Sequence, residues 1–136
     1  MDEIITYNEQ DGLVLAMIAE SKNYDIKAWL AWADGHYKMV LSYNELQSAL
    51  EKLQRGGLIL CKEHKIYCTL RGKMLLLGRY IPNSLEWIFR VQEKLRRLPF
   101  RDIAPVCYSL SEAVYNEDLQ KYLAWAESMI KSLHTP

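Results

Sequence analysis

Proline, glycine and cysteine are scarce in this sequence, whose 136 residues include 4 prolines, 6 glycines and 3 cysteines. So few prolines and glycines exclude a collagen-like or low-complexity chain, and a chain that is 50% hydrophobic is not a disordered one. The cysteines are odd in number and form no Cys-x-x-Cys pair, which is typical of reduced thiols. We therefore expect one folded domain in the cytoplasm.

Long apolar runs and a net charge are absent as well. No stretch reaches the ~18 consecutive apolar residues that a membrane helix needs, and the first apolar run, residues 13–19, lacks the basic flank of a signal peptide. We expect no membrane partner. The 17 basic and 17 acidic residues cancel, which removes the simplest indication of a nucleic-acid partner, a strongly basic chain.

The charge is nevertheless unevenly distributed along the chain. Residues 1–23 hold one basic and five acidic residues, residues 24–80 hold nine basic and five acidic, and residues 81–136 hold seven of each. A surface that attracts an anionic partner is therefore expected in the middle segment.

The first forty residues have the pattern of two helices. Residues 13–19 are apolar on every side, which is typical of a helix packed between other elements, and Asp11 and Gly12 precede them as candidate caps. Helical spacing of apolar residues predicts a second helix from about Asp25, which ends at Gly35 or has that glycine in its last turn.

A third helix is predicted from Ser42, because Ser42 and Glu45 have the spacing of a capping box. Gly56 and Gly57 follow it and provide a left-handed C-terminal cap. The helix has one apolar stripe, formed by Leu46, Ala49, Leu50 and Leu53.

Two short strand-like runs come next, at residues 58–61 and 66–68, and the polar residues between them predict a β-hairpin. Alternation places Ile66 and Cys68 on the inner face and Tyr67 on the outer face. Thr69 is a suitable N-cap for a fourth helix.

The last third of the sequence predicts two more helices. The first begins at Asn83 with Glu86 three residues on, and its stripe is Leu85, Ile88, Phe89 and Leu95. The second is capped by Ser111 or Asn116. It has an apolar seam that either packs on the protein's own core or makes a homodimer, formed by Leu119, Tyr122, Ala126, Met129 and Leu133.

Residues 46–59 (LQSALEKLQRGGLI) and 67–72 (YCTLRG) resemble the winged helix-turn-helix superfamily, with Cys68 where leucine is usual. The similarity is greatest to small bacterial winged-helix proteins of unassigned role. It implies a mainly α fold with a small β-hairpin, organised as a winged helix-turn-helix domain over residues 1–82. Residues 83–136 are then a C-terminal helical extension that packs on this domain and mediates dimerisation.

The resemblance implies a DNA-binding, transcription-regulator-like protein whose third helix, from Ser42 to Arg55, enters the major groove of double-stranded DNA. Acidic Glu45 and Glu51 oppose this by cancelling the two cations of the helix. The implied DNA-contacting residues are Tyr43, Asn44, Gln47, Ser48, Lys52 and Arg55 on the helix, with Lys62, His64 and Lys65 on the wing.

The alternative is a non-catalytic module for protein interaction or self-association, since a fold does not fix a function. The neutral charge, four tryptophans, nine tyrosines and C-terminal seam fit it, because interface cores are rich in aromatics and poor in charge.

Metal and catalytic sites have little support in the sequence. Cys61, His64 and Cys68 surround the hairpin tip and are potential zinc ligands, which leaves zinc an open alternative, but a structural zinc site needs four ligands and no fourth lies nearby. There is no nucleophile motif, glycine-rich phosphate loop or HExxH helix. We therefore expect no cofactor, no metal and no enzymatic activity.

Overall fold

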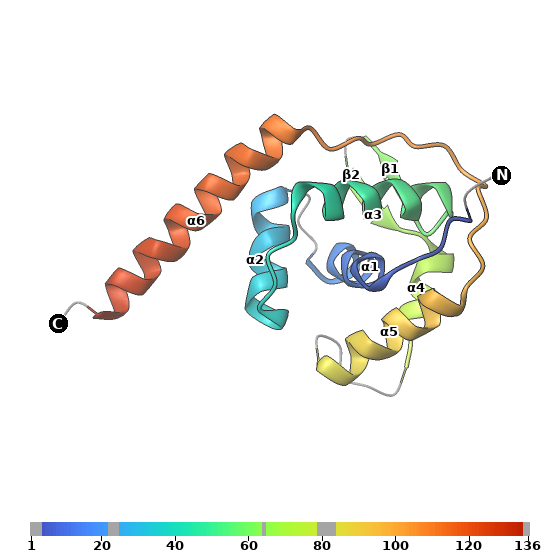
Figure 1. The fold of residues 1–136 in the computed structure, drawn as a ribbon, viewed down its shortest axis with the longest axis horizontal. Helices are drawn as coiled ribbons and strands as arrows, with labels where there is room; N and C mark the ends of the chain where they lie inside the picture. The colour runs from blue at the N-terminus through green and yellow to red at the C-terminus, as the bar shows by residue number, and fades with distance from the viewer. Residues whose placement is uncertain (1–3, 22–24, 64, 79–83, 135–136) are drawn as a thin grey trace.

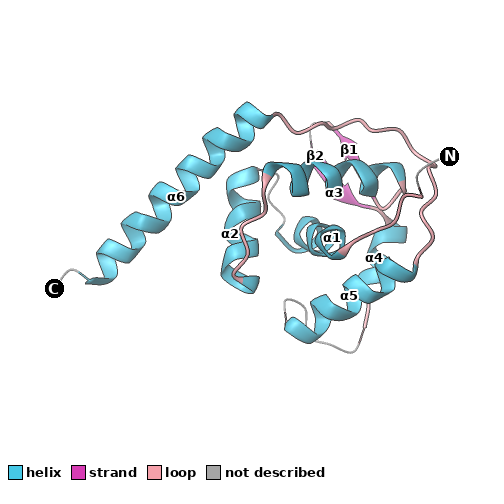
Figure 2. Ribbon diagram, in the orientation of Figure 1, coloured by secondary structure: helices cyan, strands magenta, loops and turns pink. Residues whose placement is uncertain are grey.

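The computed structural model describes residues 4–21, 25–63, 65–78 and 84–134 (Figure 1). Over these residues the fold is mainly helical with one two-stranded antiparallel sheet, as predicted (Figure 2). No helix within the described ranges is both long and apolar enough to cross a membrane. In chain order the elements are α1 (Glu9–Ser21), α2 (Ile26–Tyr37), α3 (Tyr43–Arg55), β1 (Ile59–Lys62), β2 (Lys65–Cys68), α4 (Leu70–Leu76), α5 (Leu85–Arg97) and α6 (Glu112–His134).

Helix α1 occupies the centre of the body, where it packs against α2, α3, α5, α4 and β2 (Figure 1). Residues 14–17 have no exposed surface, which confirms that this apolar segment is enclosed. The predicted caps are wrong because the helix begins at Glu9. Asn8 caps it instead, exchanging backbone-to-side-chain hydrogen bonds with Asp11 at 2.8 and 3.1 Å.

Gly12 therefore lies inside α1, at the point where this helix meets α5. A Cβ atom at this position would lie 2.8 Å from Cγ of Gln92, so only glycine allows so close an approach.

Helices α2 and α3 begin as predicted. The Asp25 side chain accepts a hydrogen bond from the N–H of Ala28, and α2 continues through Gly35 to Tyr37. The capping box of α3 is confirmed, since Ser42 and Glu45 exchange hydrogen bonds of 3.0 and 3.1 Å. Of the two glycines that follow α3, Gly57 has the left-handed backbone, with φ of 73°.

Strands β1 and β2 form the predicted hairpin, paired from Ile59 with Cys68 to Lys62 with Lys65. Ile66 is buried and Tyr67 is exposed, as the alternation predicts. Thr69 caps α4 by accepting from the N–H of Gly72, and its hydroxyl reaches the carbonyl oxygens before β1.

Helix α5 differs from the prediction at its start and on its buried face. Ser84 caps it by accepting from the N–H of Trp87, while Asn83 lies outside the described residues. Leu85 and Phe89 are 59% and 63% exposed. The indole N–H of Trp87 donates to the carbonyl of Leu76, which turns the tryptophan side of the helix inward. The buried residues are Trp87, Ile88, Val91 and Leu95.

Helix α6 follows Ser111, one of its two predicted caps, and its first half packs on α2. The Tyr115 hydroxyl donates to the carbonyl of Leu41, and the Tyr122 hydroxyl donates to the Asp34 carboxylate. Burial and the bond to Asp34 raise the pKa of Tyr122 to about 12, so its hydroxyl stays protonated at neutral pH. The second half of α6 extends away from the other elements (Figure 1).

Candidate functional site

The segment between α5 and α6, residues 98–111 and hereafter the connector, runs along α3 as an extended chain (Figure 1). Backbone contacts attach its first part to the end of the helix. The carbonyl of Arg55 accepts hydrogen bonds from the N–H groups of Ile103, at 2.8 Å, and Ala104, at 3.1 Å. The connector thereby satisfies a carbonyl that the end of a helix leaves without an intrahelical partner.

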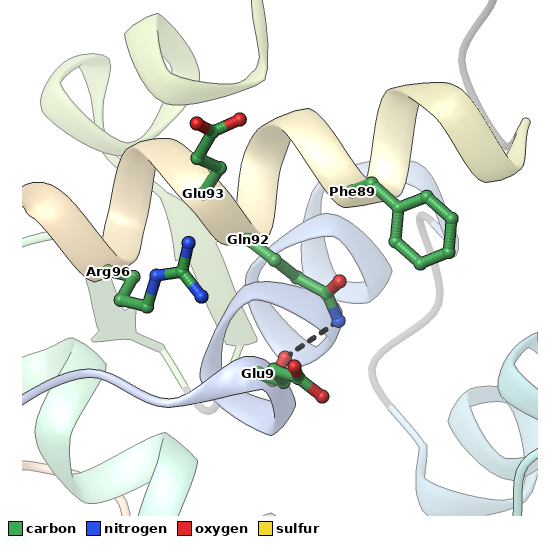
Figure 3. Close-up of a pocket in the computed structure, with 5 residues that line it drawn as sticks. All are labelled: Glu9, Phe89, Gln92, Glu93 and Arg96. Carbon is green, nitrogen blue, oxygen red and sulfur yellow. Dashed lines mark hydrogen bonds between the residues drawn. The ribbon is translucent and has the colours of Figure 1, made fainter.

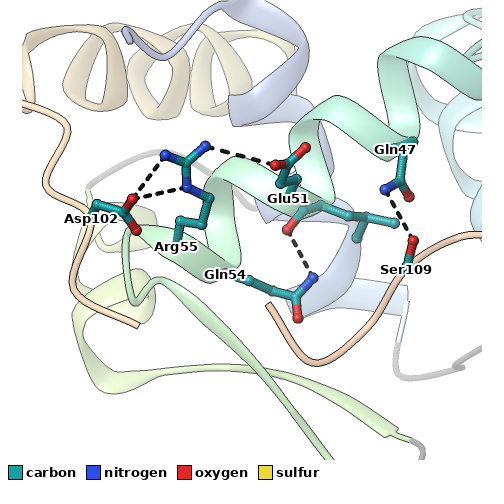
Figure 4. Close-up of polar contacts among 7 residues, drawn as sticks. Gln47, Glu51, Gln54, Arg55, Asp102 and Ser109 are labelled. Carbon is teal, nitrogen blue, oxygen red and sulfur yellow. Dashed lines mark hydrogen bonds and ion pairs between the residues drawn. The ribbon is translucent and has the colours of Figure 1, made fainter. Parts of the chain in front are cut away.

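Gln54 is the principal side chain that holds the connector. Its side-chain oxygen accepts from the N–H groups of Cys107 and Tyr108, both at 2.9 Å, and its amide donates to the carbonyl of Tyr108 at 2.8 Å. A further bond to the Leu50 carbonyl within α3 uses the second amide proton (Figure 4). Gln54 is 2% exposed, so the amide is buried with its hydrogen-bonding capacity filled.

Tyr43 and Gln47, which were predicted to contact DNA, lie on the same flank of α3 as Gln54 and also bind the connector. The Gln47 oxygen accepts from the N–H of Leu110 at 2.7 Å, and its amide donates to the Ser109 hydroxyl at 3.4 Å (Figure 4). The Tyr43 hydroxyl donates to the carbonyl of Leu110 at 2.8 Å. Tyr43 and Gln47 therefore act as anchors for the connector in this structure.

Arg55 is held by acidic and aromatic neighbours. Its guanidinium lies 2.8 Å from Asp102 of the connector and 3.7 Å from Glu51, one turn earlier on α3 (Figure 4). It also lies 5.3 Å from the ring centroid of Phe100. The hydrogen bond from Arg55 lowers the pKa of Asp102.

Lys52 is directed back toward the start of α1. Its ammonium lies 2.5 Å from the Asp11 carboxylate and 3.3 Å from the carbonyl of Thr6. Asp11 is 1% exposed, and this burial raises its pKa while the hydrogen bond from Lys52 lowers it. We take the pair as ionised at neutral pH, because the 2.5 Å contact gives a buried carboxylate its counter-charge.

The outward face of α3 is consequently poor in positive charge. Asn44 and Ser48 are exposed there, next to exposed Glu51. Lys52 and Arg55, the two cations on α3, both contact carboxylates of this chain. The hairpin residues Lys62 and Lys65 are exposed and lie opposite one another, while His64 is outside the described residues.

A second surface is the end of α6, residues 125–134, hereafter the arm. Of the predicted seam, Tyr122 is buried and Leu119 and Ala126 are half-buried, so this part of the seam packs within the chain. Met129 and Leu133 belong to the same helix face but lie beyond α2. The arm exposes four apolar side chains, Trp125 at 48%, Met129 at 46%, Ile130 at 58% and Leu133 at 80%.

A hollow of about 270 Å³ lies between α2 and α6 at the base of the arm. The Tyr122 hydroxyl and the Asp25 carboxylate, which face this region, are already bound to Asp34 and to the N–H of Ala28. The residues lining the hollow are Asp25, Lys27, Ala28, Ala31, Tyr122 and Trp125.

A third feature is a polar hollow of about 190 Å³ between α5 and the start of α1 (Figure 3). Gln92 bridges the two helices by donating to the carbonyl of Glu9 at 3.0 Å. Glu93 faces Arg97 and Arg90, at 2.8 and 3.4 Å. Phe89 and Arg96 complete the lining, and none of these side chains has the geometry of an activated nucleophile.

The predicted zinc ligands are only partly placed by the structure. Cys61 and Cys68 are half-buried on the inner side of the hairpin, and burial raises the pKa of Cys68 to about 11. At this pKa the Cys68 thiol is protonated at neutral pH when no metal ion is bound. Within the described part of the chain, which omits His64, no three His, Cys, Asp or Glu side chains are close enough together to hold a metal ion.

The sequence pattern did not single out Gln54 or Asp102, although one signal was available for Gln54. Gln54 follows Leu46, Ala49, Leu50 and Leu53 at helical spacing, which predicts a buried position for a polar side chain. Such a glutamine requires partners from elsewhere in the chain. The local pattern does not show that residues more than fifty positions later provide them.

Comparison of the chain with protein-family models, with curated proteins and with solved structures found no match.

Proposed function

We propose that this protein is a non-catalytic interaction module that self-associates through its arm. The observation that supports this most directly is the continuous apolar face of α6. Its first half packs on α2, and its second half continues in the same register with nothing of the described chain over it. Apolar patches rimmed by polar residues are typical of interaction sites.

The contacts of α3 support a role in protein interaction better than a role in recognising DNA bases. A DNA reader depends on several cations free to contact phosphate. Here Lys52 and Arg55 are paired with acids of the same chain, and Tyr43 and Gln47 bind the connector. We propose that residues 1–82 provide a winged-helix-type scaffold, and that residues 83–136 adapt it to association.

The arm proposal predicts that Met129→Asp/Leu133→Asp converts a homodimer into a monomer. Both side chains lie on the exposed part of the apolar face, and burial of two carboxylates in an interface without partners is strongly unfavourable. The measurement is the mass in solution by light scattering at micromolar protein concentration.

The matched control is Ala124→Asp/Ser128→Asp, which adds the same charge at the same spacing on the opposite side of the helix. We expect this variant to stay dimeric, with the helix content of the parent by circular dichroism. A monomeric parent protein at tens of micromolar would overturn self-association, and so would equal dissociation of both variants.

DNA binding is a second candidate function, which the hairpin favours. Lys62 and Lys65 are cross-strand partners on its outer face, where Leu60 and Tyr67 are also exposed. An exposed pair of lysines beside an aromatic ring can contact a phosphate backbone. In this proposal the β1–β2 hairpin acts as the wing and supplies the phosphate contacts. Asn44 and Ser48 are the α3 residues that are exposed and can face the major groove of DNA.

If the wing binds DNA, Lys62→Ala/Lys65→Ala should weaken binding and lower the slope of log K against log salt by about 2. Fluorescence anisotropy with a labelled mixed-sequence duplex, titrated at two or more salt concentrations, measures this. Lys27→Ala/Lys38→Ala removes two exposed lysines at α2 and should leave the slope unchanged. Absence of binding by the parent protein at ~50 mM salt, where phosphate contacts are strongest, would contradict this candidate.

A further inference from the structure

Basic residues are concentrated in the part of the chain that forms α4 and α5. Residues 70–101 hold eight basic and two acidic residues, whereas the rest of the chain holds nine basic and fifteen acidic residues. The net charge of zero is therefore the balance of a basic segment and an acidic remainder. Because α4 packs on α5, the cations of both helices lie on neighbouring parts of the surface (Figure 1).

Helix α4 has an apolar stripe on its exposed side. Leu70, Met74 and Leu77 are 76%, 62% and 68% exposed. They are four and three positions apart, so they lie along one side of the helix, which ends at Leu77. The opposite side is packed, since a Cβ atom on Gly72 would lie 2.3 Å from the carbonyl oxygen of Leu58. With such high exposure, the stripe projects from the surface and does not line a groove.

Two cations of α4 border this stripe. With 3.6 residues per turn, Arg71 and Lys73 lie on its two sides, and both are exposed. An apolar strip between basic side chains is typical of helices that lie in the surface of an anionic membrane.

Helix α5 adds three cations next to the end of α4. The ammonium of Lys94 donates to the carbonyl of Leu77 at 2.6 Å. Arg90 and Arg97 lie one turn to either side of Lys94, on the same flank of α5. These two arginines share one carboxylate, that of Glu93, at 3.4 and 2.8 Å. The flank of α5 that meets α4 therefore keeps an excess of positive charge.

We propose that this surface binds an anionic lipid bilayer, with the apolar stripe inserted between the headgroups and the cations next to the lipid phosphates. Binding at the bilayer surface requires no membrane-spanning helix. The surface is separate from the arm, so the proposal does not depend on self-association. It is hereafter called the α4–α5 face and comprises Leu70, Arg71, Lys73, Met74, Leu77, Arg90, Lys94 and Arg97.

Charge and shape favour a bilayer over a protein as the occupant. A second copy of the chain would bring two identical basic faces together, and like charges across an interface are unfavourable. A partner helix needs an apolar groove. The hollow next to the stripe, between α4 and α5, is about 60 Å³, far below the roughly 300 Å³ at which ligand pockets begin. A projecting apolar stripe instead suits a fluid surface that deforms around it.

The experiment is flotation of the full chain with vesicles, either of phosphatidylcholine alone or of phosphatidylcholine with phosphatidylserine. The parent protein should float with the anionic vesicles and stay behind with the neutral ones, since each cation near an anionic bilayer raises the affinity by about fivefold. Addition of salt should weaken the binding, because salt screens the cations.

Two variants test the two components of the α4–α5 face. Leu70→Ser/Leu77→Ser should lower the affinity for anionic vesicles by about tenfold or more, because two large apolar side chains no longer leave water. Arg71→Gln/Lys73→Gln should lower it by about 25-fold, since two cations are lost. All four side chains are exposed, and circular dichroism checks that both variants keep the helix content of the parent protein.

Matched controls make the same changes elsewhere on the surface. Met39→Ser/Val40→Ser removes two apolar side chains that are 40% and 47% exposed between α2 and α3. Lys27→Gln/Lys38→Gln removes two exposed lysines at α2. Both controls should float with anionic vesicles as the parent protein does.

The outcomes separate the possible occupants. Flotation that depends on anionic lipid, is lost in both α4 variants and is kept in both controls supports the proposal. A parent protein that does not float overturns it. Loss in Arg71→Gln/Lys73→Gln but not in Leu70→Ser/Leu77→Ser also overturns it and indicates a phosphate-binding face of the kind that contacts nucleic acid. A dimer by light scattering that Leu70→Ser/Leu77→Ser dissociates identifies a second copy as the occupant and overturns it as well.

Discussion

Replacement of Gln54 by leucine is expected to lower the free energy of unfolding by about 2–4 kcal/mol, because buried polar groups without partners cost ~1–3 kcal/mol each. Leucine has a similar size, so the apolar packing of α3 changes little. The N–H groups of Cys107 and Tyr108 and the carbonyl of Tyr108 all lose their partner. Urea-induced unfolding followed by circular dichroism measures the change.

The same substitution should release the connector, which gives a second readout. Arg101 is an exposed connector residue next to Asp102, and trypsin cleavage after it should become faster than in the parent protein. Ser48→Leu is the matched control, because Ser48 is exposed on α3 and is not one of the residues described above that hold the connector. Equal stability and equal trypsin sensitivity of Gln54→Leu and the parent would show that Gln54 does not hold the connector.

Lys52→Met is expected to destabilise the protein by about 3–5 kcal/mol at pH 7, because it leaves a buried carboxylate without its counter-charge. Asp11 is 1% exposed and lies 2.5 Å from the Lys52 ammonium. Lys121→Met is the matched control. It breaks the exposed pair with Glu117, whose charged atoms are 3.4 Å apart, and should change stability by less than ~1 kcal/mol.

The pH dependence of Lys52→Met distinguishes an unpaired charge from lost packing. Burial already raises the pKa of Asp11, and removal of the opposing Lys52 bond raises this pKa further. The folded variant then binds a proton that the unfolded chain has released, so its stability falls as the pH rises through this window. Stability should recover on acidification from pH 7 toward the unfolded-state pKa of about 4.

Asp11→Asn/Lys52→Met removes the carboxylate and should abolish that recovery. A destabilisation of Lys52→Met that is independent of pH would show that Asp11 is not the group responsible. The measurement is urea-induced unfolding of both variants at a series of pH values from neutral to acidic.

Local patterns predicted most of the elements because they depend on neighbours in sequence. The capping box at Ser42 and Glu45 and the alternation in the hairpin involve residues two to three positions apart. The predicted start of α1 was wrong because Asn8 and Asp11 cap it from outside the apolar run. Leu85 and Phe89 were assigned to the buried face of α5 because periodicity does not show which flank meets α1 and α4.

The candidate sites were harder to predict because they depend on long-range contacts. The spacing of Gln47, Lys52 and Arg55 places them on a polar helix surface, as expected for an amphipathic helix. Their partners are the connector and the start of α1, which only the tertiary structure brings to α3. The seam of α6 was identified, but the point at which α2 ceases to cover it depends on how the two helices diverge in the tertiary structure (Figure 1).

Because the connector follows α3 by many residues, some contacts of α3 can form only late in the synthesis of the chain. Gln54 leaves the ribosome more than fifty residues before Cys107 and Tyr108, its principal partners. Until those residues have been synthesised, the Gln54 amide lacks its partners and this flank of α3 is exposed to water. The nascent chain therefore completes the contacts of α3 with the connector only after residue 110 has been synthesised, and chaperones that bind incomplete chains can reach this flank of α3 until then.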